Sequence, residues 1–497
     1  MPAVRADAGR FPGVSTRMRG MAHQAAILSV SRIANYGLMI ISPIVLVRFL
    51  TVTDFGRYRE FLLYASLVQT AAYFSLSESL LYFVPLHTAS MWRVVRETTF
   101  LTASISLFIV GVVVALHFFI PGGLVGPYLV PIVLYVLLSV NLDWWESLWL
   151  ATHRPVPVFV YTGGRLIARM VVVVSVAVVT NNVWAIIWSL VVLEALRFAG
   201  ALVAWTTADR SRLEPQIGNL RREQLRFCVP FGLAILLLLL SRNLGNVVIV
   251  KYLGVAALAQ FTIGTYGEPI ILALRNSISQ VLLPALVRSS KDDALRLWHR
   301  ATIINCVLLF PTAAVVAWYA EPLVLKAFGA AYRPAVPVLQ WYSLVIVRAC
   351  FDFSPLLRAI NKTRPFVWIG VVAMLVNGLA LAVLLPVTGI VGAAIGLCAA
   401  NLVEVTCLGF CVSRLYGCGL RGLLPWTAVA KVGVCAAVGA AVAFGVTFAW
   451  RASVFGAACG SVLYGAVFAA LLLAARIEEA TTLLHRLKTL VPEFRRQ

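Results

Sequence analysis

Charged side chains inside long apolar segments are the residues of this sequence whose types could do chemistry. An arginine or aspartate at the centre of a membrane span costs about 2.5 to 3.5 kcal/mol when it faces lipid. Each of these side chains must therefore face a partner or water. The set comprises Arg32, Glu78, Arg165, Arg169, Glu194, Arg197, Arg242, Glu268, Arg275, Arg348, Asp352 and Glu404.

Two pairs within this set have the spacing of ion pairs on one helical face. Glu194 and Arg197 are three residues apart, and Arg348 and Asp352 are four apart. Residues at these spacings are neighbours on an α-helix, so each partner can neutralise the other. We interpret these four residues as structural pairs first, with a direct functional role as the alternative.

Arg165 and Arg169 also share a helical face, but their charges are alike. They need an anion from elsewhere in the chain or from a ligand. Glu194 and Glu404 are the candidates within the sequence.

Three arginines, Arg32, Arg242 and Arg275, have no acidic residue three or four positions away. Either each forms a salt bridge to another helix, or together they line an aqueous cavity that binds an anion. The planar guanidinium can donate two parallel hydrogen bonds to one phosphoryl group. The sequence thus favours an anionic headgroup as the ligand, with Arg348 as a further candidate residue.

Acidic residues inside the spans are candidates for ion or proton coupling. Glu78 and Glu268 occupy comparable places in the two halves of the chain, and Asp352 is a third candidate. Burial raises the pKa of a carboxyl group and lets it exchange a proton near neutral pH. The alternative is a structural carboxylate that pairs with a cavity arginine, and Glu268 lies seven residues before Arg275, on much the same helical face.

Catalytic and metal-binding patterns are absent from the sequence. The six histidines are dispersed, and no nucleotide-binding glycine motif is present. The nine cysteines lie scattered without CxxC spacing, which is typical of packing residues. We expect no catalytic residue, no metal and no cofactor.

The elements that position these charges are membrane helices. The chain of 497 residues is 61% hydrophobic and 12% charged, which excludes a soluble globule. Apolar runs of about 20 residues follow one another from roughly residue 25 to 475 and predict an all-α polytopic membrane protein of about fourteen transmembrane helices. The net charge of +21 falls mostly on alternate loops, which the positive-inside rule assigns to the cytoplasm together with both termini. No nucleic-acid partner is therefore expected.

The order of segments predicts two pseudo-symmetric six-helix bundles followed by two additional helices. Helix one (25–50) and helix two (61–85), joined by a polar outer turn, are echoed by helices seven (225–250) and eight (256–286), and Val47-Arg48-Phe49-Leu50 recurs as Val250-Lys251-Tyr252-Leu253. The predicted organisation is a basic cytoplasmic terminus (1–24), an N-terminal bundle (25–206), a cytoplasmic linker (207–224), a C-terminal bundle (225–413), two further helices (426–475) and an amphipathic cytoplasmic tail (476–497).

Several stretches, in this order, resemble the oligosaccharide and polysaccharide flippases of the multidrug/oligosaccharidyl-lipid/polysaccharide (MOP) exporter superfamily. They are VRFLTVTDFGRY, VVIVKYLGVAALAQF, LLPALVRS, LVLKAFGAAYRPAVPVLQ and LLPVTGIVGAAIG. The resemblance implies a MATE-like fold of two bundles around a central cavity. It also implies alternating access that carries a polyprenyl-pyrophosphate-linked oligosaccharide across the cytoplasmic (inner) membrane. Arg32, Arg242, Arg275 and Arg348 would then bind the pyrophosphate.

Under this interpretation the protein is a transporter and not an enzyme. Its partners would be the lipid-linked oligosaccharide, membrane lipids, polysaccharide polymerase and glycosyltransferases. Three alternatives stay open: a cation-coupled multidrug exporter of the same superfamily, a lipid II flippase, and a membrane glycosyltransferase or polymerase. Lipid II flippases share a Ser-Arg pair resembling Ser31-Arg32, but usually carry a second arginine where this chain has Leu38.

Overall fold

The computed structural model describes residues 41–87, 90–120, 123–141, 144–152, 154–207, 219–267, 271, 282, 286–287, 289–360, 362, 364–450 and 453–475. These residues form helices and connecting turns, with no strand among them. Eleven of the described helical segments are long and apolar enough to cross a membrane. The chain is therefore a multi-pass membrane protein. The predicted count of about fourteen stays a prediction, since parts of helices one and eight lie outside the described residues.

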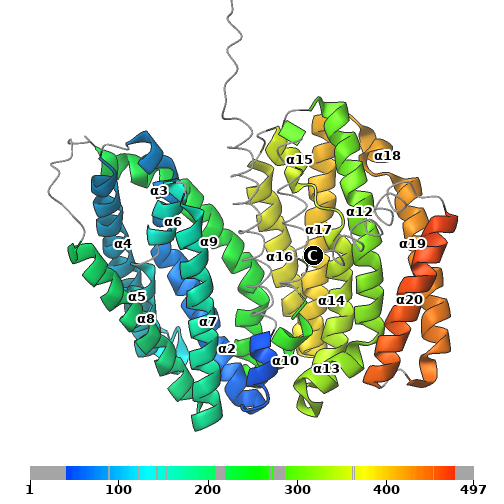
Figure 1. Cartoon of the computed structure of the whole chain (residues 1–497), viewed down its shortest axis with the longest axis horizontal. Coiled ribbons are helices and arrows are strands. Elements are labelled where there is room, and N and C mark those ends of the chain that lie inside the picture. Colours follow the sequence, from blue (N-terminus) through cyan, green and yellow to red (C-terminus); the bar gives the residue numbers. More distant parts are fainter. Residues whose placement is uncertain are drawn as a thin grey trace, which may run out of the picture.

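The helices are arranged as the two legs of a V (Figure 1). One leg contains α2 (Val52–Tyr73), α3 (Leu76–Leu86), α4 (Met91–Phe119), α5 (Leu129–Val140), α6 (Trp144–Ala151), α7 (Pro155–Thr180) and α8 (Val183–Thr207). The other contains α10 (Val255–Gly264), α12 (Lys291–Trp318), α13 (Ala320–Phe328), α14 (Ala335–Ala349), α15 (Ser354–Ala359), α16 (Arg364–Thr388), α17 (Ile390–Tyr416), α18 (Gly419–Leu423), α19 (Trp426–Val446) and α20 (Val454–Ala474). Helix α9 (Leu220–Leu253) runs between the legs and contacts α2, α3 and α4 as well as α10, α16 and α17.

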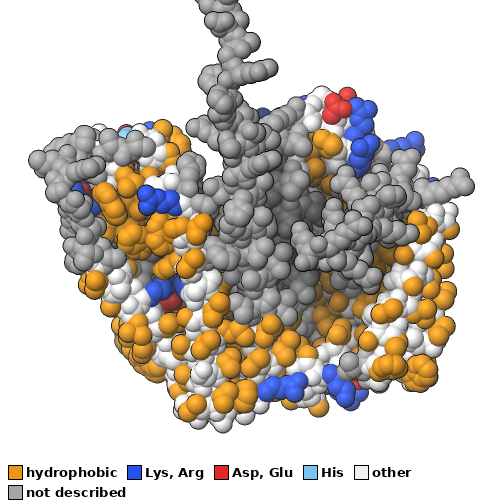
Figure 2. All heavy atoms as spheres, in the orientation of Figure 1, with side chains coloured by type: hydrophobic (Ala, Val, Ile, Leu, Met, Phe, Trp, Pro, Cys, Tyr) orange, Lys and Arg blue, Asp and Glu red, His pale blue; other side chains and the backbone are white. Residues whose placement is uncertain are grey.

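The outer flanks of both legs are apolar. In Figure 2 hydrophobic side chains are spread along the outer flanks of both legs, and Lys and Arg side chains lie along the closed end of the V, at the top of the right leg and on the left leg. A surface of this kind is stable only where lipid replaces water. The predicted boundaries of the two bundles stay predictions, because α9 contacts both legs.

Helix α2 begins earlier than the sequence pattern suggested. The expected outer turn at 51–60 is the start of this helix, which Thr51 caps by accepting a hydrogen bond from the Asp54 backbone N–H at 3.1 Å. A threonine followed three residues later by an acidic residue stabilises a helix start. The charged residues after Asp54 consequently belong to the helix, and Arg59 lies about 10 Å along it.

The legs meet at one end through close backbone packing. A Cβ atom at Gly56 of α2 would lie 2.1 Å from the carbonyl oxygen of Val255 in α10, so only glycine permits this approach. Beside this contact, Arg48 donates a hydrogen bond to the carbonyl of Lys326 at 2.9 Å, in the last turn of α13. A cation there stabilises the negative end of that helix.

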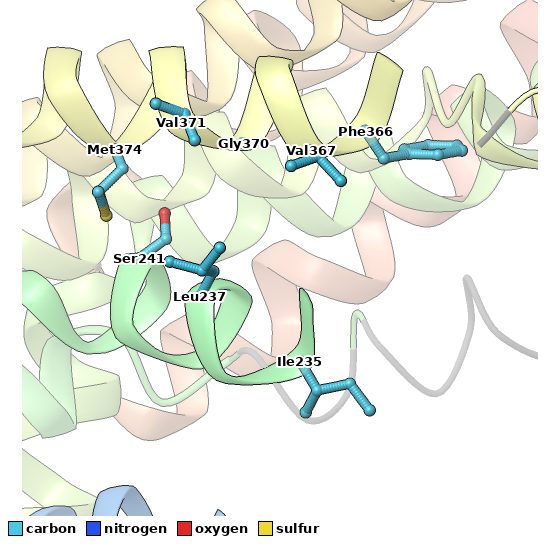
Figure 3. Close-up of a pocket in the computed structure, with 8 residues that line it drawn as sticks. All are labelled: Ile235, Leu237, Ser241, Phe366, Val367, Gly370, Val371 and Met374. Atoms are coloured by element: carbon cyan, nitrogen blue, oxygen red, sulfur yellow. The ribbon is translucent and has the colours of Figure 1, made fainter. Parts of the chain in front are cut away.

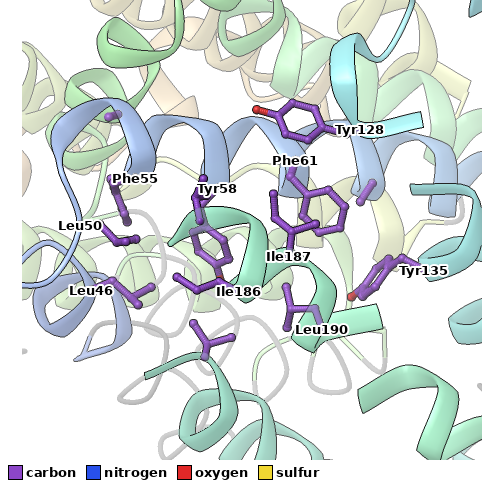
Figure 4. Close-up of a cluster of buried hydrophobic side chains, with 14 of the residues drawn as sticks. Leu46, Leu50, Phe55, Tyr58, Phe61, Tyr128, Tyr135, Ile186, Ile187 and Leu190 are labelled. Carbon is purple, nitrogen blue, oxygen red and sulfur yellow. The ribbon is translucent and has the colours of Figure 1, made fainter. Parts of the chain in front are cut away.

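A hydrophobic cluster fixes this closed end. Figure 4 shows its part around α2, where Phe55, Tyr58 and Phe61 pack against Ile186 and Ile187 of α8. The same cluster continues into the other leg through α10, α13 and α14. The closed end contains segment 51–60, which the sequence assigns to the outer side. The V therefore opens toward the predicted cytoplasmic side.

Candidate functional site: a polar and an apolar cavity between the legs

The second apolar run of the sequence is broken in its middle. Helix α2 ends at Tyr73 and α3 begins at Leu76, with Phe74 (φ 44°) and Ser75 (φ 55°) between them in the left-handed region. Residues other than glycine seldom adopt this conformation, which costs about 1 to 3 kcal/mol per residue. At membrane depth, non-helical backbone is tolerated where it is buried in protein or lines a cavity. The break is therefore a candidate binding region.

Helix α9 packs directly on this break. A Cβ atom at Gly232 would lie 3.0 Å from the carbonyl oxygen of Phe74, and the thiol of Cys228 donates to the carbonyl of Ser75 at 3.8 Å. A second contact, in which the side-chain amide of Gln224 donates to the Thr98 hydroxyl at 2.7 Å, holds the start of α9 against α4. These contacts from one helix to another stabilise a conformation that the local sequence does not favour.

A polar cavity of about 220 Å³ lies at the break. Its walls come from the end of α2, the start of α3 and one residue of α9: Gln69, Thr70, Tyr73, Ser75, Glu78 and Ile235. Hydroxyl, amide and carboxylate groups of this kind can hydrogen-bond the hydroxyl groups of a sugar or bind a proton or cation. Glu78 supplies the carboxylate. The sequence predicted that charged side chains inside the spans face a partner or water.

An apolar cavity of about 200 Å³ adjoins it. Figure 3 shows Phe366, Val367, Val371 and Met374 of α16 on one side and Ile235, Leu237 and Ser241 of α9 on the other, with Gly370 between the valines. Ile235 lines both cavities. A polar and an apolar chamber thus lie next to each other along α9, which matches a ligand that is polar at one end and apolar at the other.

Arg242 lies on the same side of α9 as Ile235. It follows Ile235 by seven residues, two helical turns and about 10 Å toward the closed end. Its side chain is exposed, and it makes no hydrogen bond or ion pair with any residue that the structure describes. A guanidinium in this position can donate two hydrogen bonds to a phosphate group that enters between the legs.

A family model described as "Polysaccharide biosynthesis protein" matches residues 45–337, more than half of the chain. The chain belongs to the polysaccharide biosynthesis protein family. No curated protein sequence matches it significantly.

Solved structures share the fold of this polysaccharide biosynthesis protein at low sequence identity. The lipid II flippase MurJ in an inward closed conformation is 12% identical with a TM-score of 0.68, covering 90% of this chain and 99% of its own. An inward-facing multidrug resistance MATE family transporter of the MOP superfamily is 11% identical with a TM-score of 0.56, covering 78% and 98%. A MOP superfamily transporter from Pyrococcus furiosus is 11% identical with a TM-score of 0.51, covering 79% and 95%. The predicted MATE-like fold and membership of the polysaccharide biosynthesis family are confirmed.

Two of the predicted site residues of this family member lie near the cavities. Glu78 lines the polar cavity, and Arg242 lies two helical turns beyond Ile235, which lines both cavities. Arg32, Arg275 and Glu268 lie outside the described residues. Their predicted roles stay predictions.

The predicted ion pair of Arg348 and Asp352, which was based on helical spacing, is wrong. Helix α14 ends at Ala349, so Asp352 is no longer on the helix that carries Arg348. Arg348 instead forms an ion pair with Glu404 of α17 at 2.7 Å, while the Asp352 carboxylate accepts a hydrogen bond from the Ser354 backbone N–H at the start of α15. Arg348 and Asp352 thus have structural contacts within the second leg, away from the two cavities.

The pair of Glu194 and Arg197 is confirmed. These side chains form a buried ion pair on α8, and Arg197 also donates to the Tyr161 hydroxyl of α7 at 2.8 Å. Arg169 lies within electrostatic range of Glu194 and of Tyr58 in α2. The sequence offered Glu194 and Glu404 as anions for Arg169. In the structure Arg169 lies near Glu194, in the first leg.

Sequence reasoning missed two features of this region. It placed Arg59 in an outer turn, whereas Arg59 lies within α2, half-buried beside Tyr266. It also treated helix two as continuous. The only local signal for the break is the run of serines at Ser75, Ser77 and Ser79, a residue type that competes for backbone hydrogen bonds.

Among the described residues, no three His, Cys, Asp or Glu side chains gather in a way that could hold a metal ion. All nine cysteines are free, and four of them are buried.

Proposed function

We propose that this protein is a flippase that carries a polyprenyl-pyrophosphate-linked oligosaccharide across the cytoplasmic membrane by alternating access. The observation that supports this most directly is the polar cavity next to the apolar cavity, with Ile235 common to both. The headgroup would occupy the polar chamber and the first isoprenoid units the apolar one, while the rest of the chain stays in lipid. Membership of the polysaccharide biosynthesis family supports a glycan as the polar part.

Each part of the site has a role in this proposal. Arg242 donates hydrogen bonds to the pyrophosphate, with Arg32 and Arg275 as further donors from the sequence analysis. Gln69, Thr70 and Tyr73 offer hydrogen bonds to sugar hydroxyls. Glu78 is the carboxylate that would couple transport to a proton or cation. Closure at the end opposite the present contact would then release the headgroup on the other side.

The cation of Arg242, near the two cavities on α9, also favours an anionic substrate over a cationic drug. Arg242 has no counterion among the described residues, so a cationic drug would meet uncompensated positive charge there. In proteoliposomes we expect transbilayer movement of polyprenyl-pyrophosphate-linked sugars and none of a cationic dye. Dye transport without lipid transport would contradict the proposal. Lipid II, which carries the same pyrophosphate linkage, is the substrate to compare directly.

Filling the apolar cavity tests the assignment of the prenyl chain. Gly370 lines this cavity, and a Cβ atom there would meet no atom within 4 Å, so Gly370→Leu places its side chain into the cavity without a backbone clash. The leucine side chain would displace part of the prenyl chain from the cavity, and removing an aliphatic group of this size from an apolar site costs about 1.5 to 3 kcal/mol of binding free energy. Affinity for polyprenyl pyrophosphate should therefore fall by about tenfold or more. Affinity for inorganic pyrophosphate should not change. Titration of the purified protein with both ligands measures this.

The matched control is Gly465→Leu. Gly465 of α20 is exposed on the membrane side and also has open space at its Cβ position. This variant makes the same chemical change away from both cavities, so its affinity should equal that of the unchanged protein. Equal affinity in Gly370→Leu and Gly465→Leu would show that the apolar cavity does not bind the chain.

A further inference from the structure

One face of α2 carries polar residues from the closed end of the V up to the polar cavity. Arg59, Ser66, Thr70 and Tyr73 are separated by seven, four and three residues, which places them on one side of the helix. Thr70 and Tyr73 line the polar cavity. Arg59 is therefore the last residue of this face, about 21 Å from Tyr73 toward the closed end.

Arg59 is a half-buried cation without a counterion in the part of the chain that the structure describes. It makes no hydrogen bond or ion pair with the residues that the structure describes. Tyr58, Tyr266 and the guanidinium of Arg169 from α7 lie within electrostatic range of its side chain. Its neighbour in sequence, Glu60, is buried elsewhere and accepts a hydrogen bond from the Tyr128 hydroxyl at 2.8 Å.

Two guanidinium groups near each other and partly shielded from water repel each other, and a bound anion relieves this repulsion. Arg169 lies within electrostatic range of Tyr58 and of the Glu194 carboxylate on α8. Tyr58 is itself fixed in the hydrophobic cluster (Figure 4). Arg59 therefore has its donors available for a ligand, while Arg169 adds positive field nearby.

Tyr266 brings the second leg to this place. It follows α10 and packs its ring against Phe328 of α13 at 5.6 Å. Arg59 thus lies where the two legs close on each other, at a depth beyond Arg242. The two arginines are on helices that contact each other, α2 and α9. They offer cations at successive depths along the path from the open end to the closed end.

We propose that Arg59, supported by Arg169, forms a second binding station for the diphosphate group at the closed end of the V, which receives the headgroup after Arg242. This inference rests on the proposed function, because it assumes a substrate with a pyrophosphate. It adds Arg59, which the sequence pattern assigned to an outer turn, to the proposed binding site.

The test compares two arginines of the same helix. Arg57 lies two residues before Arg59, is exposed and already pairs with Asp54 at 3.3 Å. Purified Arg59→Ala, Arg59→Lys and Arg57→Ala variants are titrated with polyprenyl pyrophosphate, inorganic pyrophosphate and polyprenol. Hydrogen bonds to charged groups are strong enough that Arg59→Ala should weaken binding of polyprenyl pyrophosphate by about tenfold or more. Arg59→Lys should recover part of the loss, and Arg57→Ala should bind normally.

Polyprenol, which lacks phosphate, distinguishes this role from a purely structural one. If Arg59 only stabilised the closed end, Arg59→Ala would bind polyprenol and polyprenyl pyrophosphate equally poorly, and the inference would fail. Normal affinity of Arg59→Ala for polyprenyl pyrophosphate would also overturn it, while leaving the proposed function intact. If the unchanged protein bound no polyprenyl pyrophosphate, the proposed function itself would fail. Loss of inorganic pyrophosphate binding alone would assign Arg59 to a free phosphate compound and overturn the lipid assignment.

Discussion

Replacing Gly56 by leucine is expected to abolish glycan export while the protein remains in the membrane. The Cβ atom would lie 2.1 Å from the carbonyl oxygen and 2.6 Å from the carbonyl carbon of Val255. These are backbone atoms, which cannot rotate away as a side-chain tip can. Because α2 and α10 belong to different legs, the clash is relieved most easily by separating the legs at this end.

The expected result is a protein that cannot close where it is now closed. Alternating access requires that one end of the cavity is closed while the other is open. In this variant the end at Gly56 would stay open in every state, so directed transport would stop. Export of the glycan in cells, at equal membrane levels of the variant, measures the loss. Even Gly56→Ala should show it, because its Cβ atom already occupies the clashing position.

A labelling experiment separates failed closure from misfolding. Thr70 lines the polar cavity, so Thr70→Cys in a cysteine-free background reports access from the predicted outer side. We expect a membrane-impermeant maleimide to label this position in the Gly56→Leu background and much less in the Gly56 background. Gly111→Leu is the control, since a Cβ at Gly111 meets no atom within 4 Å. Normal export by Gly56→Leu would show that this contact is not needed for transport.

The sequence predicted those features that depend on one helix alone. Apolar runs near the span length located the membrane segments, because lipid imposes the same requirement on each of them. The ion pair of Glu194 and Arg197 followed from their spacing, since both lie well inside α8. Arg242 was recognised as a charge without a neighbour on its own helix, and the structure places it beside the apolar cavity.

The features that depend on contacts between helices could not be predicted. The break at Phe74 and Ser75 has no glycine or proline, and it is stabilised by α9, which approaches closely because of Gly232. The partner of Arg348 is Glu404, on another helix, and no spacing rule connects residues so distant in sequence. Arg59 was assigned to a turn because its surroundings are highly charged, yet Thr51 and Asp54 start a helix there.

Replacing Glu194 by glutamine is expected to destabilise the first leg strongly. Glu194 is 6% exposed, and its carboxylate is the anion near both Arg197 and Arg169. Glutamine keeps the size of the side chain but removes its charge, so two partly buried guanidinium groups lose this anion. Breaking a buried pair by removing one partner typically costs about 3 to 5 kcal/mol. Thermal unfolding of the purified protein in detergent measures the loss.

Two further variants make this expectation specific. In Glu194→Gln/Arg197→Gln both charges of the pair are gone, so much of the stability should return, because replacing a whole buried pair is often close to neutral. The control is Glu321→Gln, whose partner Arg333 is 74% exposed at 3.0 Å, and a surface pair contributes about 0 to 1 kcal/mol. If Glu194→Gln unfolded at the same temperature as Glu321→Gln, the carboxylate would not be neutralising Arg197 and Arg169. If the double variant were no more stable than Glu194→Gln, the loss would come from packing or from Arg169 rather than from the missing anion beside Arg197.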